Sequence, residues 1–438
     1  LVGLLQLVLT WLKWARFSYL IPSAAIQGML ASIGFMLMAK QIPNFIGHKY
    51  MAHEFFPIIV ETPSEIGNLD WSVFLLSSIC LTLLFLLPKL KAQFLKFMPP
   101  QLVVVIVGVI LGRLLHLDTR FLVHVPDNPL EHGIVPPDFR LLFADPSAWK
   151  VVASAVILLC FVDGTESLAT IHAVDRLDPF HRRSNPDRTL AAMGVSNICS
   201  SLIGGITIIP GIIKSTTCIV SGGRTAWVNF YNALFLIFFI LAAKDQINMI
   251  PIGALAAVLA HIGYKLAGLH KWRFIKSLGI EQMAVFVTTI LVTLNSDLLI
   301  GIFAGMLVKI GILIYFNVRG SEKEAGLLAS LRDIFASPIE KVEQSNSVMN
   351  VYLKGPVNCF NSLKLRGVLD KIPAEVSVIN VYITRAVTLV DHSVSSYFYT
   401  LSDDCRRAGQ TLSVIGLEAL RSQTRHASSL KYKAKLVG

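Results

Sequence analysis

The residues best suited to chemistry lie in one stretch, from Gly204 to Thr225, that glycine and proline interrupt. Pro210 lacks a backbone N–H and fits the first turn of a helix, so we expect a short helix to start there. The free amides of that turn and the positive end of its dipole favour an anion. Lys214 adds a cation, and Ser215 and Thr216 add hydroxyl donors. Together with Gly211, these residues predict a site for a small oxyanion.

The same stretch has a second interpretation, because apolar residues surround it on both sides. Non-helical backbone inside a membrane is tolerated only where it lines a cavity or is covered by protein, which favours a site. The alternative is a kinked helix whose Lys214 extends its ammonium group to the membrane interface.

Two carboxylates form the second group of interest, within the sequence FVDGTESLATIHAVDRLDP. Asp163 and Glu166 are three residues apart and therefore lie on one face of a helix that is otherwise apolar. Carboxylates inside a membrane usually face a polar cavity or a partner. Glu166 is expected either to bind a coupling H⁺ or Na⁺, to pair with Lys214, or to form a buried polar link between helices. His172 is interpreted as a residue at the end of the helix and not as a ligand.

The elements that position these residues follow from composition, since 54% of the 438 residues are hydrophobic and only 15% are charged. Soluble domains contain about 25% charged residues, so the chain is not expected to be a soluble enzyme. A membrane-spanning helix needs roughly 20 apolar residues. Candidate spans lie near residues 1–15, 21–46, 71–90, 98–116, 148–173, 188–205, 228–244, 251–267, 282–296 and 298–317. We expect the stretch between the sixth and seventh spans to enter the membrane partway.

Charges in the connections predict the orientation of these spans. The net charge is +11, from 39 Lys and Arg against 28 Asp and Glu. One set of alternate connections is rich in cations, and the opposite set is rich in carboxylates. Because cations gather on the cytoplasmic side, the first set is predicted to be cytoplasmic, and the positive charge reports orientation without implying nucleic acid. The six cysteines form no disulfide framework and no metal-binding spacing, and no metal or other cofactor is expected.

After about Val318 the pattern becomes that of a soluble protein. Residues 318–347 are interpreted as a linker containing an amphipathic helix, and residues 1–317 as the transmembrane domain. In residues 348–438, strands at VMNVYLKG, VSVINVYIT and TLSVIGL alternate with helices, which predicts a small cytoplasmic α/β domain. The first residue is Leu1, within an apolar run, so we expect the chain to begin inside a membrane helix with upstream spans missing.

Several of these stretches, in this order, resemble the SulP family of sulfate permeases and solute carrier 26 anion transporters. The matching sequences are IPSAAIQGML, QIPNFIG, ESLATIHAVDRLDP, NPDRTLAAMGVSNICSSLIGG, KSTTCIVSGGRT and IPIGALAAVLAHIGYKL. The resemblance extends from Leu1 to about Val318, and the tail is similar to a STAS domain. Asp391, His392 and Ser393 fall at a loop that in STAS domains ends in glycine, but Val394 stands in its place here.

The resemblance implies a polytopic α-helical membrane protein with two inverted seven-segment repeats, of which the first three segments are missing here. It places the anion between the half-helices of the third and tenth segments. On that map Glu166 is on segment eight, the helix from Pro210 is segment ten, Lys214 replaces a substrate-adjacent arginine, and Ile213 falls where some animal relatives have serine. It also implies a homodimer in the cell (inner) membrane.

We therefore expect secondary transport of a small anion such as sulfate or bicarbonate, by movement of a core bundle against a gate bundle, as a symport with H⁺ or Na⁺. Two alternatives remain open at this point. One is a nucleobase permease of the same fold, although such carriers place a carboxylate or amide where Ile213, Lys214 and Ser215 stand. The other is a membrane scaffold that recruits cytoplasmic partners through its STAS domain. No enzyme is expected, because the sequence has no nucleotide-binding glycine loop, HExxH motif or nucleophile elbow.

Overall fold

The computed structural model describes residues 1–433 except for short gaps at residues 14, 16–19, 90–97, 127–134, 139, 141–142, 144–146, 181, 183, 212–213, 216–217, 220–221, 321–326, 346, 371 and 374. Its internal contacts divide the chain into two units. The first contains residues 1–15 and 30–268, and the second contains residues 16–29 and 269–438. Each unit is described by itself.

All ten apolar segments predicted from the sequence form helices. They are α1 (Val2–Trp11), α2 (Ser23–Ile46), α4 (Trp71–Leu86), α5 (Pro100–Leu114), α7 (Ala148–Leu177), α8 (Pro186–Leu202), α10 (Trp227–Ala242), α12 (Ile252–Ala267), α14 (Ile280–Asn295) and α15 (Leu298–Gly320). Within the described residues, five helical stretches are long and apolar enough to cross a membrane: Ser23–Ile46, Trp71–Lys89, Ala148–Leu168, Ile252–Leu278 and Leu298–Arg319. Length and composition thus support a multi-pass membrane protein.

Among the described residues, further helices lie in segments where the sequence predicted only connections, namely α3 (Phe55–Glu65), α11 (Lys244–Ile247) and α13 (Leu269–Leu278). The sequence of α3, FFPIIVETPSE, contains a proline near each end and two carboxylates. A helix with proline in its first turn and polar residues in its second half carries no long apolar run, so it resembles a loop when only hydrophobic length is considered.

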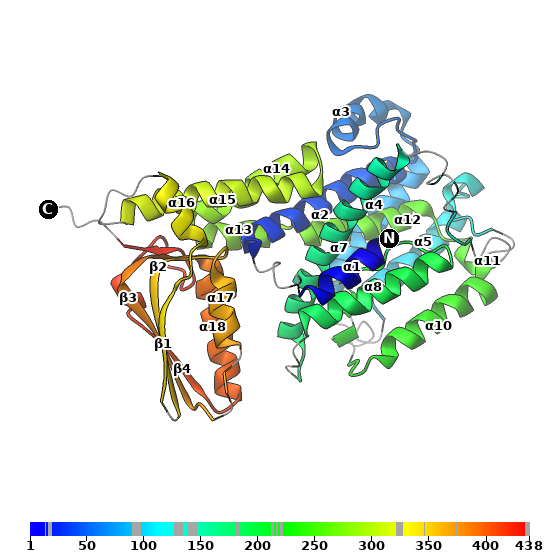
Figure 1. Ribbon diagram of the computed structural model, residues 1–438. Helices are drawn as coiled ribbons and strands as arrows, with labels where there is room; N and C mark the ends of the chain where they lie inside the picture. Colours follow the sequence, from blue (N-terminus) through cyan, green and yellow to red (C-terminus); the bar gives the residue numbers. More distant parts are fainter. Residues whose placement is uncertain are drawn as a thin grey trace. The chain divides into compact units, whose positions relative to one another are not determined.

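In the first unit, α1 lies along α8 (Figure 1). Small residues allow this approach, because a Cβ on Gly3 would stand 2.5 Å from the carbonyl oxygen of Gly194, and a Cβ on Gly194 would stand 2.8 Å from that of Gly3. Apolar side chains of α7 and α8 complete the contact, among them Leu168, Ile171 and Leu190. The pair α1–α8 is therefore held at a fixed, short separation.

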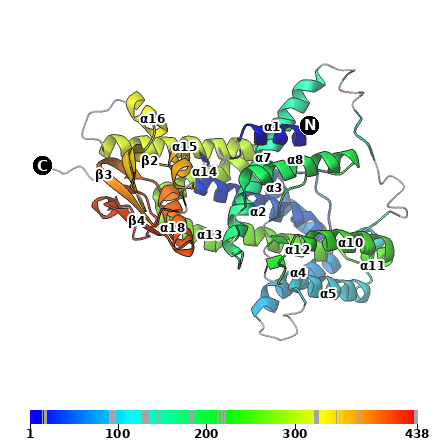
Figure 2. The ribbon, with the colours of Figure 1, turned by 60° about the horizontal axis from the view of Figure 1, so that its bottom comes forward.

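A second cluster of the same unit joins α4, α5 and α12 (Figure 2). Its buried members are Leu76, Cys80, Leu84, Val104, Ala254 and Ala257. By contrast, α10 has no buried residue, although its sequence WVNFYNALFLIFFILA is almost wholly apolar. Such a helix is uncovered by the described protein along its whole length, as expected of a helix that faces lipid.

The second unit contains α13, the hairpin of α14 and α15, the start of α2 and the C-terminal sheet. Glycines bring the helices together at Thr289, since a Cβ on Gly305 would overlap the Thr289 hydroxyl and one on Gly28 would stand 2.8 Å from the Thr289 Cβ. The helices α2, α14 and α15 therefore meet at one threonine of α14.

The C-terminal α/β domain has six strands: β1 (Ile339–Ser345), β2 (Val348–Val357), β3 (Val378–Val390), β4 (Thr411–Ile415), β5 (Arg421–Ser422) and β6 (Lys431–Tyr432). The order is β1-β2-β3-β6-β5, and β4 also pairs with β3. β2, β3 and β4 are parallel, as predicted from the alternation of strands and helices. The helices α17 (Ser362–Leu369) and α18 (His392–Arg407) cover one face (Figure 1). Their side chains Leu365, Leu369, Phe398 and Leu401 fill the core.

The sheet begins earlier than the sequence predicted. Residues 318–347 were expected to be a linker, but β1 within them pairs antiparallel with β2. Most side chains of β1, IEKVEQS, are exposed. A charged edge strand has the composition of a linker, which explains the difference. The amphipathic helix predicted in the same stretch is present as α16 (Leu327–Phe335), and its Ile334 packs between α15 and the sheet.

A buried ionic cluster joins α15 to the α/β domain. The Lys309 Nζ donates to the Oδ1 of Asp391 at 2.6 Å and lies 3.8 Å from the Oε1 of Glu281, with all three side chains inaccessible or nearly so. Burial alone would raise the pKa of Asp391, but attraction by the Lys309 ammonium lowers it below the usual value. Around this pair, Met306, Ile310 and Leu313 of α15 pack on the domain. One face of the second half of α15 is thus covered by protein in this unit.

Replacing Lys309 with alanine is expected to lower the free energy of unfolding by roughly 3–5 kcal/mol, because Asp391 is then buried without a cation. The thermal unfolding midpoint of the detergent-solubilised protein measures this effect. Lys341→Ala is the matched control, since Lys341 pairs with Glu343 on the surface and its loss should leave the midpoint unchanged. Equal midpoints for the two variants would contradict the expectation.

Candidate functional site

The interrupted stretch begins where α8 ends. Gly204 has a φ of +84°, in the left-handed region, and the Gly205 N–H donates to the carbonyl of Ser200 at 2.8 Å. This arrangement closes the C-terminus of a helix and usually requires glycine. The helix therefore stops at this point because its sequence supplies Gly204 and Gly205 in succession.

After Gly205 the chain is non-helical as far as Gly211, and side chains of α8 satisfy part of its backbone. The Ser200 hydroxyl donates to the carbonyl of Ile206 at 2.8 Å. The Ile208 N–H donates to the Oδ1 of Asn197 at 2.6 Å. Proline at position 210 has no N–H to satisfy. The break is thus held against α8 by specific hydrogen bonds.

A second, short helix follows the break. The Ser215 N–H donates to the carbonyl of Gly211 at 2.9 Å, as in a helix, and Lys214 and Ser215 are helical. Pro210 and Gly211 are non-helical, and residues 212–213, where the helix predicted from Pro210 would continue, lie outside the described residues. Gly222, with a φ of +87°, ends the helix, and the Gly223 N–H donates to the carbonyl of Cys218.

The predicted anion-site residues are placed as follows. Pro210 and Gly211 are half-buried at the break, Lys214 is exposed, and Ser215 is half-buried in the first turn. Ile213 and Thr216 lie outside the described residues. The described part therefore brings an ammonium group and a hydroxyl group to the start of one helix, at the end where its amides have no partner within the helix.

The far end of the interrupted stretch is attached to the end of α7. The Arg182 guanidinium donates to both oxygens of Asp178, at 2.8 and 3.0 Å, and to the carbonyl of Arg224 at 3.0 Å. Hydrogen bonds from Arg182 hold the pKa of Asp178 well below its usual range. Arg224 also stands over the ring of Phe180. This anchor fixes the exit of the short helix as Asn197 fixes its approach.

The two carboxylates of α7 differ in burial. Asp163 is 1% exposed and its Oδ2 has no hydrogen-bond partner within the described part of the chain, whereas Glu166 is half-buried. The hydroxyl of Ser167 donates to the Asp163 carbonyl at 2.5 Å. Asp163, Ser167 and Thr170 are all buried and recur at the spacing of one helix face. Of the two carboxylates, Asp163 is therefore the one that lies on the buried polar face of α7, with Ser167 and Thr170.

The sequence left open whether Glu166 pairs with Lys214. No ion pair joins them in the part of the chain that the structure describes, so the pairing considered from the sequence is not formed here. The side chain of His172 lies outside the described residues.

The sequence did not single out Asn197 and Gln6, which position the break. The Asn197 Nδ2 donates to the Gln6 Oε1 at 2.9 Å, and both side chains are buried. A polar amide within an otherwise apolar helix is the signal that could have identified each of them. Their pairing, across 191 residues, has no local signal.

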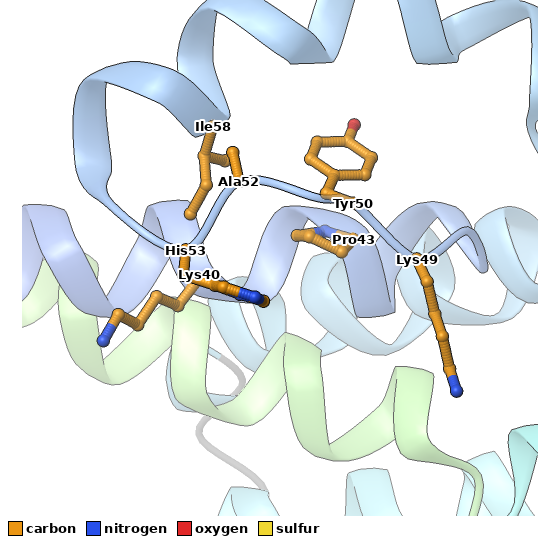
Figure 3. Close-up of a pocket in the computed structure, with 7 residues that line it drawn as sticks. All are labelled: Lys40, Pro43, Lys49, Tyr50, Ala52, His53 and Ile58. Carbon is orange, nitrogen blue, oxygen red and sulfur yellow. The ribbon is translucent and has the colours of Figure 1, made fainter.

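One open pocket lies elsewhere in the first unit, at the end of α2 (Figure 3). It is lined by Lys40, Pro43, Lys49, Tyr50, Ala52, His53 and Ile58. Figure 3 shows the amino groups of Lys40 and Lys49 extending away from each other. The pocket contains none of the predicted site residues and its two ammonium groups do not converge, so the interrupted stretch remains the candidate site.

Several known membrane transporters are similar in sequence to this chain. Residues 1–291 match the sequence profile of the sulfate permease family. The chain is 26% identical over 320 residues to the bicarbonate transporter BicA of Synechocystis sp., covering 71% of this chain and 54% of that protein. It is 25% identical over 315 residues to the putative sulfate transporter YbaR of Bacillus subtilis, covering 70% and 59%. The chain thus spans between half and three-fifths of the length of these relatives.

Two solved structures share the fold. The transmembrane domain of a cyanobacterial bicarbonate transporter BicA gives a TM-score of 0.57 at 23% identity, covering 69% of this chain and 74% of that one. Murine solute carrier 26 family member A9, an anion transporter in the inward-facing state, gives 0.61 at 13% identity, covering 94% and 68%. The helical part of the chain therefore has the fold of a membrane transporter.

The anchor between Asp178 and Arg182 leads to a prediction about pH. A carboxyl group whose pKa is lowered by folding stabilises the folded state above its unfolded pKa of about 3.9, and this contribution is lost as the pH falls through the lower, folded value. Amide exchange in the peptide containing Arg224 should therefore be constant from pH 8 to about 5, after correction for intrinsic exchange, and rise only in stronger acid. Arg182→Gln should raise it at all these pH values. Unchanged exchange in Arg182→Gln would show that the anchor does not hold Arg224.

Proposed function

The chain belongs to the sulfate permease family, and on that premise we propose that it transports a small inorganic anion, such as sulfate or bicarbonate, by secondary transport. The observation that carries this proposal is the break at residues 205–211, followed by a short helix in which the Ser215 N–H donates to the Gly211 carbonyl and Lys214 is the neighbouring residue. The names of relatives, which include bicarbonate and sulfate transporters, support the same class of substrate.

The chemistry of binding follows from the donors at that helix start. An oxyanion that leaves water needs N–H, O–H or cationic groups to replace its hydration. In the proposal these come from the amides after Pro210 and Gly211, from Lys214, and from hydroxyl groups at Ser215 and Thr216, while Ile213 shapes the site. A nucleobase edge would instead require a carboxylate or amide here, and Lys214 supplies neither.

Coupling is assigned in the proposal to the acidic face of α7, with Asp163 as the group that binds the ion. A buried carboxylate without a partner is costly unless it binds a proton or a cation. Asp163 meets that description, since its Oδ2 has no partner among the described residues, and Glu166 lies one turn away on the same face. H⁺ or Na⁺ bound at Asp163 would then accompany the anion as a symport.

The remaining parts of the proposal concern assembly. The helices would act as a core bundle that moves against a gate bundle, as inverted repeats in the cell (inner) membrane. The C-terminal α/β domain would be a cytoplasmic STAS domain, with β2, β3 and β4 as its parallel strands, and it would support a homodimer and bind cytoplasmic partners.

The site is tested by measuring anion uptake into proteoliposomes that contain the full-length protein. Lys214→Ala should raise the half-saturation concentration roughly ten-fold or more, because a hydrogen bond to a charged group contributes about 1.5–3 kcal/mol. Lys150→Ala, which removes another lysine of the same unit, should leave it unchanged. The site assignment is wrong if Lys214→Ala and Pro210→Leu both behave as the wild type.

The same assay separates the alternatives. Uptake of uracil or xanthine that exceeds anion uptake would indicate a nucleobase permease. If the wild type moves no solute under any imposed gradient while it binds cytoplasmic proteins, the scaffold interpretation replaces transport.

Imposed gradients test the coupling residue. Asp163→Asn removes the ionisable group while keeping its size, so uptake driven by a H⁺ or Na⁺ gradient should fall to the rate seen without a gradient. Glu166→Gln is the matched comparison and should retain gradient-driven uptake, because Glu166 is less buried. Gradient dependence that survives in Asp163→Asn would exclude Asp163 as the coupling site.

A further inference from the structure

The break between α8 and the short helix depends on one buried side-chain amide. Of the backbone groups in residues 206–211, the Ile208 N–H lies in the middle, and its acceptor is the Oδ1 of Asn197 at 2.6 Å. This hydrogen bond spans 11 residues and crosses from the non-helical segment back to α8. Without it, the amide of Ile208 would need another acceptor in a largely apolar setting.

The identity of the donor fixes which way this amide faces. Because Ile208 donates its N–H, Asn197 must present its oxygen to the segment and its NH₂ group to the opposite side. On that side lies the Oε1 of Gln6, at 2.9 Å from Nδ2. The sequence of donors therefore runs in one direction, from Ile208 to Asn197 and from Asn197 to Gln6.

Gln6 is itself held in place by the close contact of two helices. It lies on α1 one turn after Gly3, and Asn197 lies on α8 one turn after Gly194. These two glycines are the ones whose added Cβ atoms would clash with the opposite backbone. A pair of buried amides one turn from such a contact has little freedom to move apart. Both side chains are fully or nearly fully buried, at 0% exposure for Gln6 and 5% for Asn197.

We propose that Asn197, oriented by Gln6, is a positioning residue that fixes the interrupted segment and thereby the place of the Lys214 ammonium and the helix start. This inference rests on the proposed anion site and extends it to residues of α1 and α8. Two consecutive hydrogen bonds, from Ile208 to Asn197 and from Asn197 to Gln6, then make the position of the segment depend on the separation of α1 and α8. A shift of α1 would then move the donors of the anion site without touching the anion.

Cys218 provides a measurement of segment position that does not depend on transport. It is half-buried in the short helix, and of the other free cysteines only Cys199 is exposed. In a Cys199→Ser background, the rate of maleimide labelling at Cys218 should rise several-fold in Asn197→Leu, which removes both hydrogen bonds. Ser201→Ala is the matched control, because Ser201 is on the same helix and, among the described residues, its hydroxyl bonds only to the carbonyl of Ile198 in that helix. Labelling in Ser201→Ala should match the wild type.

Uptake by the same variants tests the consequence for the site. Asn197→Leu should raise the half-saturation concentration roughly ten-fold or more, because the Ile208 N–H loses its acceptor and the segment before Lys214 is no longer held. Asn197→Asp should restore it at least in part, because a carboxyl oxygen at position 197 still accepts from the Ile208 N–H. A merely structural role would lower the unfolding temperature of Asn197→Leu without changing the half-saturation concentration, and without rescue by Asn197→Asp.

The outcomes separate the two proposals. If the wild type takes up no anion, the proposed function fails, while Cys218 labelling still decides whether Asn197 holds the segment. Faster labelling in Asn197→Leu, reversed in Asn197→Asp, supports the positioning role. Labelling and half-saturation that both stay at wild-type values in Asn197→Leu would overturn it.

Discussion

The backbone of residues 205–211 leaves one helix before it enters the next, and its amide groups need partners in a setting where water is scarce. A continuous helix provides hydrogen-bond partners for its own amide groups, but the backbone at a break must bond to groups of neighbouring segments. In this protein α8 supplies them, through the hydroxyl of Ser200 and the amide of Asn197. The anchor of Arg182 at the other end serves the same need. The first amides of a helix that follows such a break have no acceptor within the helix, and they favour an anion.

Lys309 and Asp163 are both buried charged residues, and the free-energy cost of burying a charge is offset differently at each. Lys309 is fully buried, and two carboxylates surround it. Asp163 is equally buried, but its Oδ2 lacks any partner among the described residues. A charge that is matched stabilises a contact, and one that is unmatched creates a demand for a proton or a cation. The first arrangement suits a structural junction, and the second suits a site that binds and releases an ion.

How much the sequence could predict depended on the range of each interaction. The ten apolar helices follow from the length of hydrophobic runs, and the strands β2, β3 and β4 follow from alternation, so both were predicted correctly. The broken helix could be predicted because Gly204 and Pro210 act locally. Asn197 with Gln6, and Lys309 with Asp391, are 191 and 82 residues apart, and no local pattern pairs them. β1 was missed because an exposed edge strand has the polar composition of a linker.

The cluster at Lys309 also changes where the protein can be divided. Composition changes near residue 318, yet the ammonium group on one side of that point has its closest counter-ion on the other. A fragment that ends there retains a cation without its carboxylate, and a fragment that starts there retains Asp391 without its cation. The point where the composition changes is therefore not a point where the chain can be divided without separating a buried cation from its counter-ion. Two fragments that each keep their buried charges paired require a division on the N-terminal side of Lys309 and its partners.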